Sequence, residues 1–402
     1  MKIADAKAIV VANPPPHFGG PYFIFVKLVT DGGVVGWGEV YAATFGPHVM
    51  ARMVEDVCAR HVIGADPFRI EKLWHAVYGA GYTLRPDLSV MGVLSAIETA
   101  CWDIVGKECG RPVYDLLGGR VHDRLRTYTY LYPRTGDVYP DADDPGNVYV
   151  NPDLAAEYAA DCVAEGFTAV KFDPAGPYTV YDGHQPSLDD IARSVAFVKK
   201  IRAAVGTRAD LLFGTHGQFT AAGAIRLARQ LEPYDPLWFE EPTPPENPAE
   251  MARVARQTTI PIATGERLTT KHEFARVLEC QAAAILQPAL GRCGGILEGK
   301  KIAAMAEAHY AQLAPHLYCG PIEAAANIQL ATCSPNFLIL ESIQKMDGFH
   351  AQLLKTPLVW EDGYIIPPTA PGIGVELDEA VAEAHPWTGA GLHLSMVEDP
   401  VR

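Results

Sequence analysis

The chain has 402 residues, of which 49% are hydrophobic and 20% are charged, and it carries a formal net charge of −15. This composition supports a large buried core, whereas the negative charge argues against nucleic acid or an anionic membrane as the main partner, because both need a positive protein surface. The N-terminal apolar run is too short for a signal peptide, and no apolar run reaches the length of a membrane span. We therefore expect a cytoplasmic protein with reduced cysteines.

Residues 1–122 have the pattern of an α+β domain. An opening strand over residues 3–11 is followed by two strands on either side of Asp31-Gly32-Gly33, which is a strong hairpin signal. Helical patterns come next, the clearest over residues 93–107, where apolar residues recur at helix spacing. Strands first and helices afterwards favour a separate α+β domain.

From residue 123 the pattern alternates between strands and helices. Helices are expected between eight candidate strands over residues 125–131, 168–173, 210–213, 236–239, 261–264, 283–287, 312–315 and 337–340. Eight such units predict a parallel sheet closed into a TIM-like barrel over residues 123–355. An open doubly wound sheet is the alternative. The remaining segment, residues 356–402, is loop-rich with one helix over residues 378–384, and we expect it to pack back on the first domain.

Polar residues stand where successive strands of the second domain meet the following loops: Asp173, His216, Glu240, Glu266, His316 and Glu341. The carboxyl ends of parallel strands converge on one mouth of a barrel, where such folds carry their chemistry. Two neighbouring carboxylates there repel each other unless a hard divalent cation neutralises them, so Glu240 and Glu266 are candidate metal ligands. Salt bridges, for example between Glu266 and Arg267, are the alternative.

Several motifs resemble those of one family. They are SAIETACWDIVGKECGRPVYDLLGG over residues 95–119, KFDP at 171–174, WFEEP at 238–242, ATGERL at 263–268, QPALGRCGG at 287–295 and APHLYCGP at 314–321. Together they resemble the enolase superfamily, in its mandelate racemase and muconate lactonizing enzyme branch, and most closely the acid-sugar dehydratases of the galactonate-dehydratase type. The resemblance covers nearly the whole chain.

This resemblance implies an N-terminal capping domain over a (β/α)7β barrel, a Mg²⁺ cofactor, abstraction of the proton next to a substrate carboxylate, and assembly into a homo-oligomer. It also implies roles for single residues. Glu240 and Glu266 resemble metal ligands, Lys171 the lysine that contacts the substrate carboxylate, His316 the general base, His216 the general acid, and Glu341 the carboxylate that hydrogen-bonds the intermediate.

Two positions depart from the family pattern. Gly214 stands where the resemblance implies a third metal ligand, an Asp, and glycine has no side chain to coordinate with. Ala289 stands where it implies an Asp that orients His316 and raises its pKa. Asp173 replaces the second basic residue of the racemase pair, and its oxygens are another possible metal donor.

Candidate substrate contacts come from loops that face the mouth. They are His17 and Tyr22 near the N-terminus, residues 41–48, and the insertion over residues 174–187, which adds Tyr178, Tyr181 and His184. A long loop at a barrel mouth is often a lid or a specificity element. A simple surface excursion explains it equally well.

These observations favour a hydro-lyase that converts a small-molecule sugar acid into a 2-keto-3-deoxy acid, with His316 as base, His216 as acid and a divalent metal on Glu240 and Glu266. Racemisation is less favoured because Asp173 is not a base of the racemase type. Cycloisomerisation of a sugar-acid lactone uses the same enolate and stays open. Gly214 and Ala289 also leave open a barrel without catalytic activity that binds a small molecule.

Overall fold

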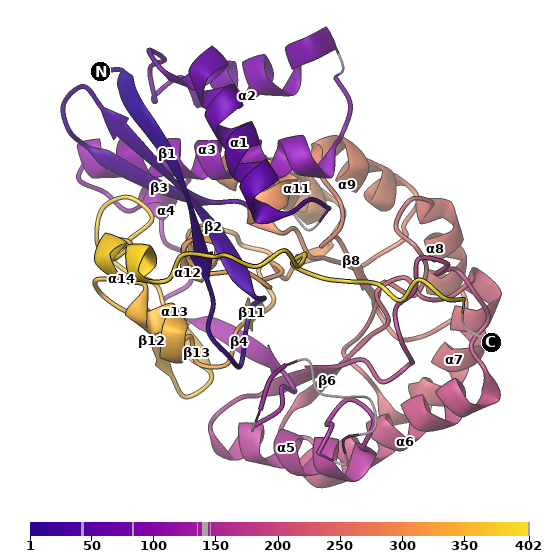
Figure 1. Ribbon diagram of the computed structural model, residues 1–402. Helices are drawn as coiled ribbons and strands as arrows, with labels where there is room; N and C mark the ends of the chain where they lie inside the picture. The colour runs from indigo at the N-terminus through magenta and orange to yellow at the C-terminus, as the bar shows by residue number, and fades with distance from the viewer. Residues whose placement is uncertain (42–43, 83, 135, 139–143, 145, 401–402) are drawn as a thin grey trace.

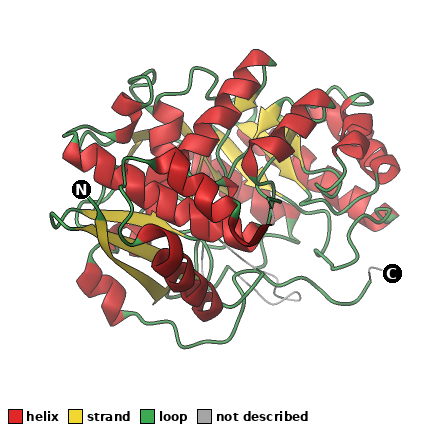
Figure 2. Cartoon of the chain, turned by 90° about the horizontal axis from the view of Figure 1, so that it is seen from above, coloured by secondary structure: helices red, strands yellow, loops and turns green. Residues whose placement is uncertain are grey.

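In the computed structural model the chain forms a capping domain beside a parallel barrel (Figures 1 and 2). The structure describes residues 1–41, 44–82, 84–134, 136–138, 144 and 146–400. The capping domain pairs three antiparallel strands in the order β1-β2-β3 and covers one face of them with helices. These elements are β1 (Ile3–Ala12), β2 (Tyr22–Thr30), β3 (Val35–Glu39), α1 (Pro47–Val57), α2 (Ile70–Tyr78) and α3 (Leu88–Glu108).

Helix α3 is the central element of the capping domain. It begins at Asp87, whose carboxylate accepts hydrogen bonds from the backbone amides of Ser89 and Val90, an arrangement that stabilises a helix start. The helix is long and apolar enough to span a membrane, but 83% of its most apolar window is buried inside the protein. It therefore has the surroundings of a core helix, and its apolar surface is covered by the sheet and by the barrel.

Eight parallel strands form the barrel, as predicted. Strands β4 to β10 pair in sequential order, β11 pairs with β4, and a parallel bridge between Leu313 and Phe337 joins the β10 side to the segment before β11. The strands are β4 (Leu125–Tyr130), β5 (Ala169–Phe172), β6 (Asp210–Gly214), β7 (Trp238–Glu240), β8 (Ile262–Thr264), β9 (Ile285–Leu286), β10 (Gln312–Leu313) and β11 (Leu340–Ser342).

Seven crossover helices connect these strands and give the expected (β/α)7β order. They are α5 (Pro152–Ala164), α6 (Leu188–Val205), α7 (Ala221–Leu231), α8 (Pro248–Ala255), α9 (Thr270–Glu279), α11 (Ile296–Ala308) and α12 (Pro321–Thr332), with the short helices α4 (Val113–Leu116) and α10 (Leu290–Cys293) beside them. Most strand boundaries differ from the prediction by one or two residues, and the last strand differs most, because it begins at Leu340 and contains Glu341. Phe337 makes only an isolated bridge.

The C-terminal segment makes contacts with both domains. A hairpin of β12 (Val359–Glu361) and β13 (Tyr364–Ile366), which the sequence analysis did not predict, pairs antiparallel with β4 of the barrel. The segment then passes α14 (Glu379–Ala384), and Pro386 makes a bridge to Val11 in β1. A short helix, α13 (Gly348–Gln352), precedes the hairpin. Packing on the first domain, which we expected, is thus one of two attachments.

Two buried glutamates dock the capping domain on the barrel. Glu39 accepts hydrogen bonds from the amides of Gly320 and Glu323 at the start of α12, and Glu98 accepts from Ile296 and Leu297 at the start of α11. Helix N-termini present unpaired amides and a positive dipole end, so a carboxylate from another domain is a suitable partner. Burial raises the pKa of each of these two glutamates to about 8.

We expect Gly38→Ala to destabilise the protein, because a Cβ at this position would overlap the carbonyl of Ala96 in α3. The overlapping atoms belong to the backbone and cannot move aside as a flexible side chain can. The free energy of unfolding should therefore fall by about 2 kcal/mol or more. Gly32→Ala in the same hairpin is the matched control, since its Cβ would meet nothing closer than 3.8 Å. Equal melting temperatures of the two variants in thermal denaturation would contradict this account.

Candidate active site

The inward side chains of the barrel form two layers. The floor is a cluster with one residue from each strand or its flank, Tyr128, Ala169, Leu212, Trp238, Ala263, Ile285, Ala314 and Ile339. Side chains of a strand alternate between its two faces, so the next inward position lies two residues further along. These positions hold Tyr130, Lys171, Gly214, Glu240, Gly265, Gln287, His316 and Glu341. Of the predicted polar series, Glu240, His316 and Glu341 thus lie in the second layer of the barrel interior. Asp173, His216 and Glu266 follow that layer toward the mouth, after Lys171, Gly214 and Gly265.

Lys171 is the central cation of this layer. Its Nζ lies 2.6 Å from Oε1 of Glu240 and 3.7 Å from Oε1 of Glu341, and its side chain is buried. Burial by itself lowers the pKa of Lys171, but the carboxylates of Glu240 and Glu341 outweigh that effect and raise it well above its usual range. The lysine is therefore charged, and it allows several carboxylates to share one buried space.

Glu266 lies between two imidazoles. Its Oε1 is 3.5 Å from Nε2 of His216, and its Oε2 is 3.3 Å from Nδ1 of His316. Burial raises the pKa of Glu266, but the charges of His216 and His316 outweigh it, and the pKa falls well below its usual value. The structure therefore brings together the metal-ligand, acid and base candidates of the sequence around one carboxylate.

His316 has an acidic partner although position 289 has none. Its Nδ1 lies 2.8 Å from Oε2 of Glu341, an ion-pair distance without hydrogen-bond angles. Burial acts to lower the pKa of His316, while Glu341 and Glu266 raise it above its usual value. Nε2 has no hydrogen-bond partner among the described residues. Glu341 thus supplies the charge that Ala289, itself fully buried in the core, cannot provide.

His216 belongs to a second chain of polar groups. Its Nδ1 lies 2.6 Å from Oδ2 of Asp173, and the hydroxyls of Tyr130 and Tyr178 both donate hydrogen bonds to the same carboxylate. Burial works against a charged ring, but Glu266 and Asp173 outweigh it and raise the pKa of His216 to about 9. The carboxylate of Asp173 is therefore paired with His216. Arg267 pairs with Glu241, at 2.8 Å from Nε to Oε2, so the alternative pairing of Arg267 with Glu266 is not the observed one.

The missing side chain at 214 would point into this site. Gly214 pairs with Glu240 in the sheet, and a Cβ built on it would lie 3.5 Å from Oδ2 of Asp173 and 3.7 Å from Cε of Lys171. These are ordinary van der Waals distances. The position is therefore on the inner face of the barrel, and it lacks only the carboxylate.

The remaining donors fit a divalent cation. One ligand atom each from His216, Glu240 and Glu266 can be chosen so that all lie within 4.8 Å of one another. Oε2 of Glu266 is buried without a hydrogen-bond partner among the described residues. Mg²⁺ commonly binds through one or two carboxylates and keeps several waters, so Glu240 and Glu266 are a sufficient carboxylate set.

The candidate substrate contacts are placed differently from one another. Tyr178 packs on His216 with ring centroids 4.7 Å apart, and Tyr22 is buried in β2. His17 pairs with Asp137, with 2.6 Å between Nδ1 and Oδ2, and Tyr181 is 59% exposed on the insertion loop. The structure thus brings Tyr178 to the site and leaves Tyr181 at the surface.

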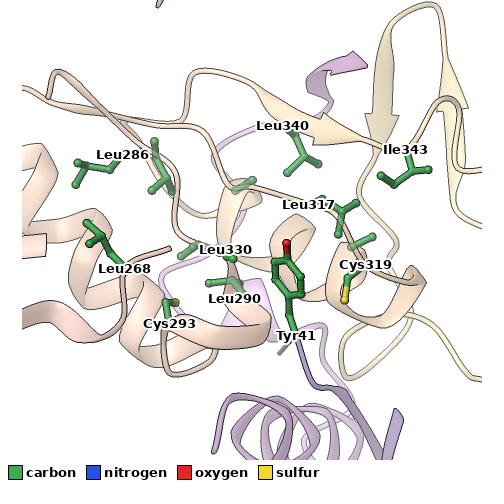
Figure 3. Close-up of a cluster of buried hydrophobic side chains, with 14 of the residues drawn as sticks. Tyr41, Leu268, Leu286, Leu290, Cys293, Leu317, Cys319, Leu330, Leu340 and Ile343 are labelled. Atoms are coloured by element: carbon green, nitrogen blue, oxygen red, sulfur yellow. The ribbon is translucent and has the colours of Figure 1, made fainter. Parts of the chain in front are cut away.

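Among residues 41–48, Tyr41 reaches the site, while residues 42 and 43 lie outside the described part of the chain. The Tyr41 ring stacks on His316 with centroids 5.7 Å apart, and the guanidinium of Arg292 lies 3.5 Å from its centroid. Figure 3 shows Tyr41 extending from the capping domain among side chains of the barrel such as Leu317 and Leu330. The capping domain therefore forms part of the wall around the base candidate.

Gln287 is a site residue that the sequence analysis missed. Its amide donates to Oε2 of Glu240 at 2.8 Å. It stands two residues after Ile285 in the floor, so the same period-two pattern that gives Lys171 and Glu240 identifies it. Its neutral side chain gives it no signal in a search for charged residues.

The fold and the site define a class: a (β/α)7β barrel with a capping domain, which holds two histidines, a lysine and several carboxylates at the mouth end of its interior. Comparisons with known proteins agree. Residues 18–118 match the mandelate racemase / muconate lactonizing enzyme N-terminal domain, and residues 153–381 match the enolase C-terminal domain-like family. The chain belongs to the enolase superfamily, in its mandelate racemase and muconate lactonizing enzyme branch.

Individual relatives are similar over most of their length. D-galactonate dehydratase of Ralstonia nicotianae is 40% identical over 370 residues, which cover 90% of each protein. A crystal structure assigned to mandelate racemase/muconate lactonizing enzyme from Labrenzia alexandrii is 66% identical, with a TM-score of 0.96 and full coverage of both chains. A mandelate racemase/muconate lactonizing enzyme from Sulfitobacter sp. is 59% identical, with a TM-score of 0.95 and full coverage of both.

Gly214→Asp should tighten Mg²⁺ binding, on the order of tenfold, because it adds a carboxylate on the inner face next to Glu240. Gly214→Asn is the matched control, since it adds nearly the same volume without the charge. Isothermal titration calorimetry of both variants and the wild type measures the affinity. An Asp variant that binds Mg²⁺ no better than the Asn variant would show that position 214 does not reach the ion.

Glu341→Gln should lower the pKa of His316, because of the two carboxylates that raise this pKa it removes the one with the larger effect. A raised pKa keeps His316 protonated up to a higher pH, so the variant should gain its neutral form at lower pH than the wild type does. NMR titration of ¹⁵N-labelled histidines measures the shift. His350 is the internal reference, because burial lowers its pKa to about 4 and Glu341 is not among the groups that shift it. Its titration should not change in the variant.

Proposed function

We propose that the protein dehydrates a sugar acid to a 2-keto-3-deoxy acid, by removing the proton next to the substrate carboxylate. The observation that carries this proposal is the pair of imidazoles on either side of Glu266. His316 lies on its Oε2 side and His216 on its Oε1 side. An elimination of water needs one group that accepts a proton and another that gives one.

His316 is the general base of this proposal. Its Nδ1 faces Glu341 and Glu266, while its Nε2 has no hydrogen-bond partner among the described residues and is available to a substrate proton when the ring is neutral. The nearby carboxylates stabilise the imidazolium that forms when the proton is taken. Lys171 lies in the same layer as His316. Its buried ammonium supplies a fixed positive charge for the carboxylate of the substrate, where negative charge develops as the proton leaves.

His216 is the general acid. With a pKa of about 9 it is charged at neutral pH and loses its proton only as the pH rises through that value. Asp173 holds Nδ1, so Nε2 is the nitrogen that protonates the departing β-hydroxyl. Asp173 itself is held by the hydroxyls of Tyr130 and Tyr178, which disfavours a second base on this strand and with it racemisation.

A divalent cation, Mg²⁺ in this proposal, would be held by Glu240 and Glu266. When bound, such an ion supplies Lewis-acid stabilisation of the negative charge that develops on the substrate carboxylate. His216 is close enough to be a third donor, but we assign it to proton transfer because imidazole is a poor ligand for Mg²⁺. The nearly full-length similarity to D-galactonate dehydratase supports a sugar acid as the substrate class.

A screen of the wild-type protein against a library of sugar acids with Mg²⁺ present tests the proposal, with 2-keto-3-deoxy acids as the detected product. Galactonate belongs in the library because of the relatives. Ring opening or closure of a lactone without a keto acid would identify a cycloisomerase. No turnover of any acid by a correctly folded protein would overturn the proposal and favour the binding protein without catalysis.

Glu266→Gln should reduce any turnover by at least about a hundredfold, since it removes a metal ligand and the charge between the two histidines. It should also lower the melting temperature measured with Mg²⁺ more than the one measured with EDTA, because bound ligand stabilises the folded state. Glu279→Gln, at the exposed end of α9, is the control. Equal shifts with Mg²⁺ and with EDTA would count against a metal at Glu266.

A further inference from the structure

The C-terminal chain runs across the mouth of the barrel after α14 (Figure 1). We call residues 385–397 the strap. Its first end is fixed to the capping domain, where Ala12 donates to the carbonyl of His385 at 2.7 Å and Trp387 donates to Val10 at 3.3 Å. Its other end pairs with the insertion loop, where Val397 donates to Tyr178 at 2.8 Å and Val180 donates back to Val397 at 3.0 Å. The strap therefore links the two walls of the mouth.

Between these ends one side chain turns inward. His393 is 3% exposed, while its neighbours Leu392 and Leu394 are 40% and 44% exposed. A Cβ at Gly20 would overlap the His393 ring, so the glycine provides the space that the ring fills. A single buried histidine between exposed neighbours indicates an inserted residue, not a loosely covered tail.

The rings in contact with His393 are aromatic, and Arg292 lies behind one of them, Tyr41. The ring centroid of His393 lies 5.5 Å from Tyr22, 5.4 Å from Tyr41 and 5.6 Å from Tyr318. Tyr41 in turn stacks on His316. Burial lowers the pKa of His393 to about 3, so the ring stays neutral at working pH. His393 is thus one aromatic ring away from the base, on the side opposite to the barrel floor.

The base side of the site is nearly closed to substrate. His316 is 4% exposed, Glu266 6% and Lys171 1%, whereas the side chain of His216 is 26% exposed. A substrate carbon therefore needs a covering segment to move before it can contact the base. Tyr41 is fixed to the barrel by its amide on Gly291 and by Arg292 on its ring. The strap has no helix and is attached by single bridges at residues 386 and 397, so its opening should cost less than displacement of Tyr41.

We propose that the strap is the lid of the active site, and that His393 is a substrate-binding residue which covers the hydroxyl-bearing end of the sugar acid. The proposal rests on the function proposed above. Neutral imidazole and phenol groups are both donors and acceptors, which suits uncharged hydroxyls, whereas the substrate carboxylate belongs beside Lys171 at the other end. The strap also holds the backbone of Tyr178, whose hydroxyl fixes Asp173 and so orients His216. Closure of the strap thus also orients His216, the proposed proton donor.

Hydrogen exchange tests the lid without any substrate. His393→Ala should accelerate exchange of the Val180 and Val397 amides together by about tenfold or more, because an inserted side chain holds the whole strap in place. Val397→Pro, which removes one of the two pairing amides, should do the same at Val180. Leu394→Ala is the matched control and should leave exchange unchanged. An exchange rate at Val180 that is the same in His393→Ala as in the wild type would overturn the proposal that the strap is a lid.

Kinetics on an acid found in the screen test the role of His393. His393→Ala should raise KM by about tenfold with a smaller effect on kcat, as expected for a group that binds the non-reacting end. Val397→Pro and Tyr178→Phe should both lower kcat, and Tyr178→Phe should do so without changing exchange at Val180. Unchanged KM in His393→Ala would overturn the substrate contact. No turnover by the wild type would defeat the proposed function alone, because the exchange result decides the lid independently.

Discussion

The buried ammonium of Lys171 is the constraint on which the arrangement of the site depends. Without it, Glu240, Glu266 and Glu341 would be like charges in a space that water scarcely reaches, and their pKa values would rise toward protonation. With Nζ at 2.6 Å from Glu240 and 3.7 Å from Glu341, the lysine compensates both. A buried cation is itself costly, so it persists only because these partners surround it. The floor of eight mostly apolar side chains beneath Lys171 offers its ammonium no polar partner toward the other end of the barrel. Acid, base and candidate metal ligands are then arranged around the same ion pairs.

The capping domain is held by the same kind of interaction in a different setting. Glu39 and Glu98 reach the N-termini of α12 and α11, where backbone amides replace a cationic side chain as the partner. Glu39 is the last residue of β3, and Tyr41 follows two residues later against His316. Domain docking and the wall of the site are therefore set by one short segment. The close approach of Gly36 and Gly38 to α3 fixes where that segment leaves the capping domain.

Much of this could be predicted from the sequence because the barrel repeats itself. Strand, helix and strand recur, and inward positions follow at a period of two, so Lys171, Glu240, His316 and Glu341 are visible as polar residues at strand ends. What could not be predicted depends on the reach of side chains between strands. The sequence shows that Ala289 lacks a carboxylate, but only the structure shows that Glu341 approaches His316 from the neighbouring strand. Tyr178 and Tyr181 are equivalent in the sequence, and the turn between them sends one to His216 and the other to solvent. His393 has no signal at all, since a lone histidine in a loop-rich tail belongs to no periodic pattern.

The charges of the cluster explain how it tolerates two departures at once. Four carboxylates, those of Asp173, Glu240, Glu266 and Glu341, face the cation of Lys171 and the two histidines, whose pKa values are both raised. The cluster is close to neutral balance in this form. An Asp at 214 and another at 289 would add two negative charges, which a tightly bound divalent ion would have to offset. Their absence shifts the balance so that less positive charge is required from outside. The substrate brings one further carboxylate, and that is the moment at which an additional cation stabilises the site most. The absence of a carboxylate at Gly214 and at Ala289 therefore changes the charge of the site in the same direction.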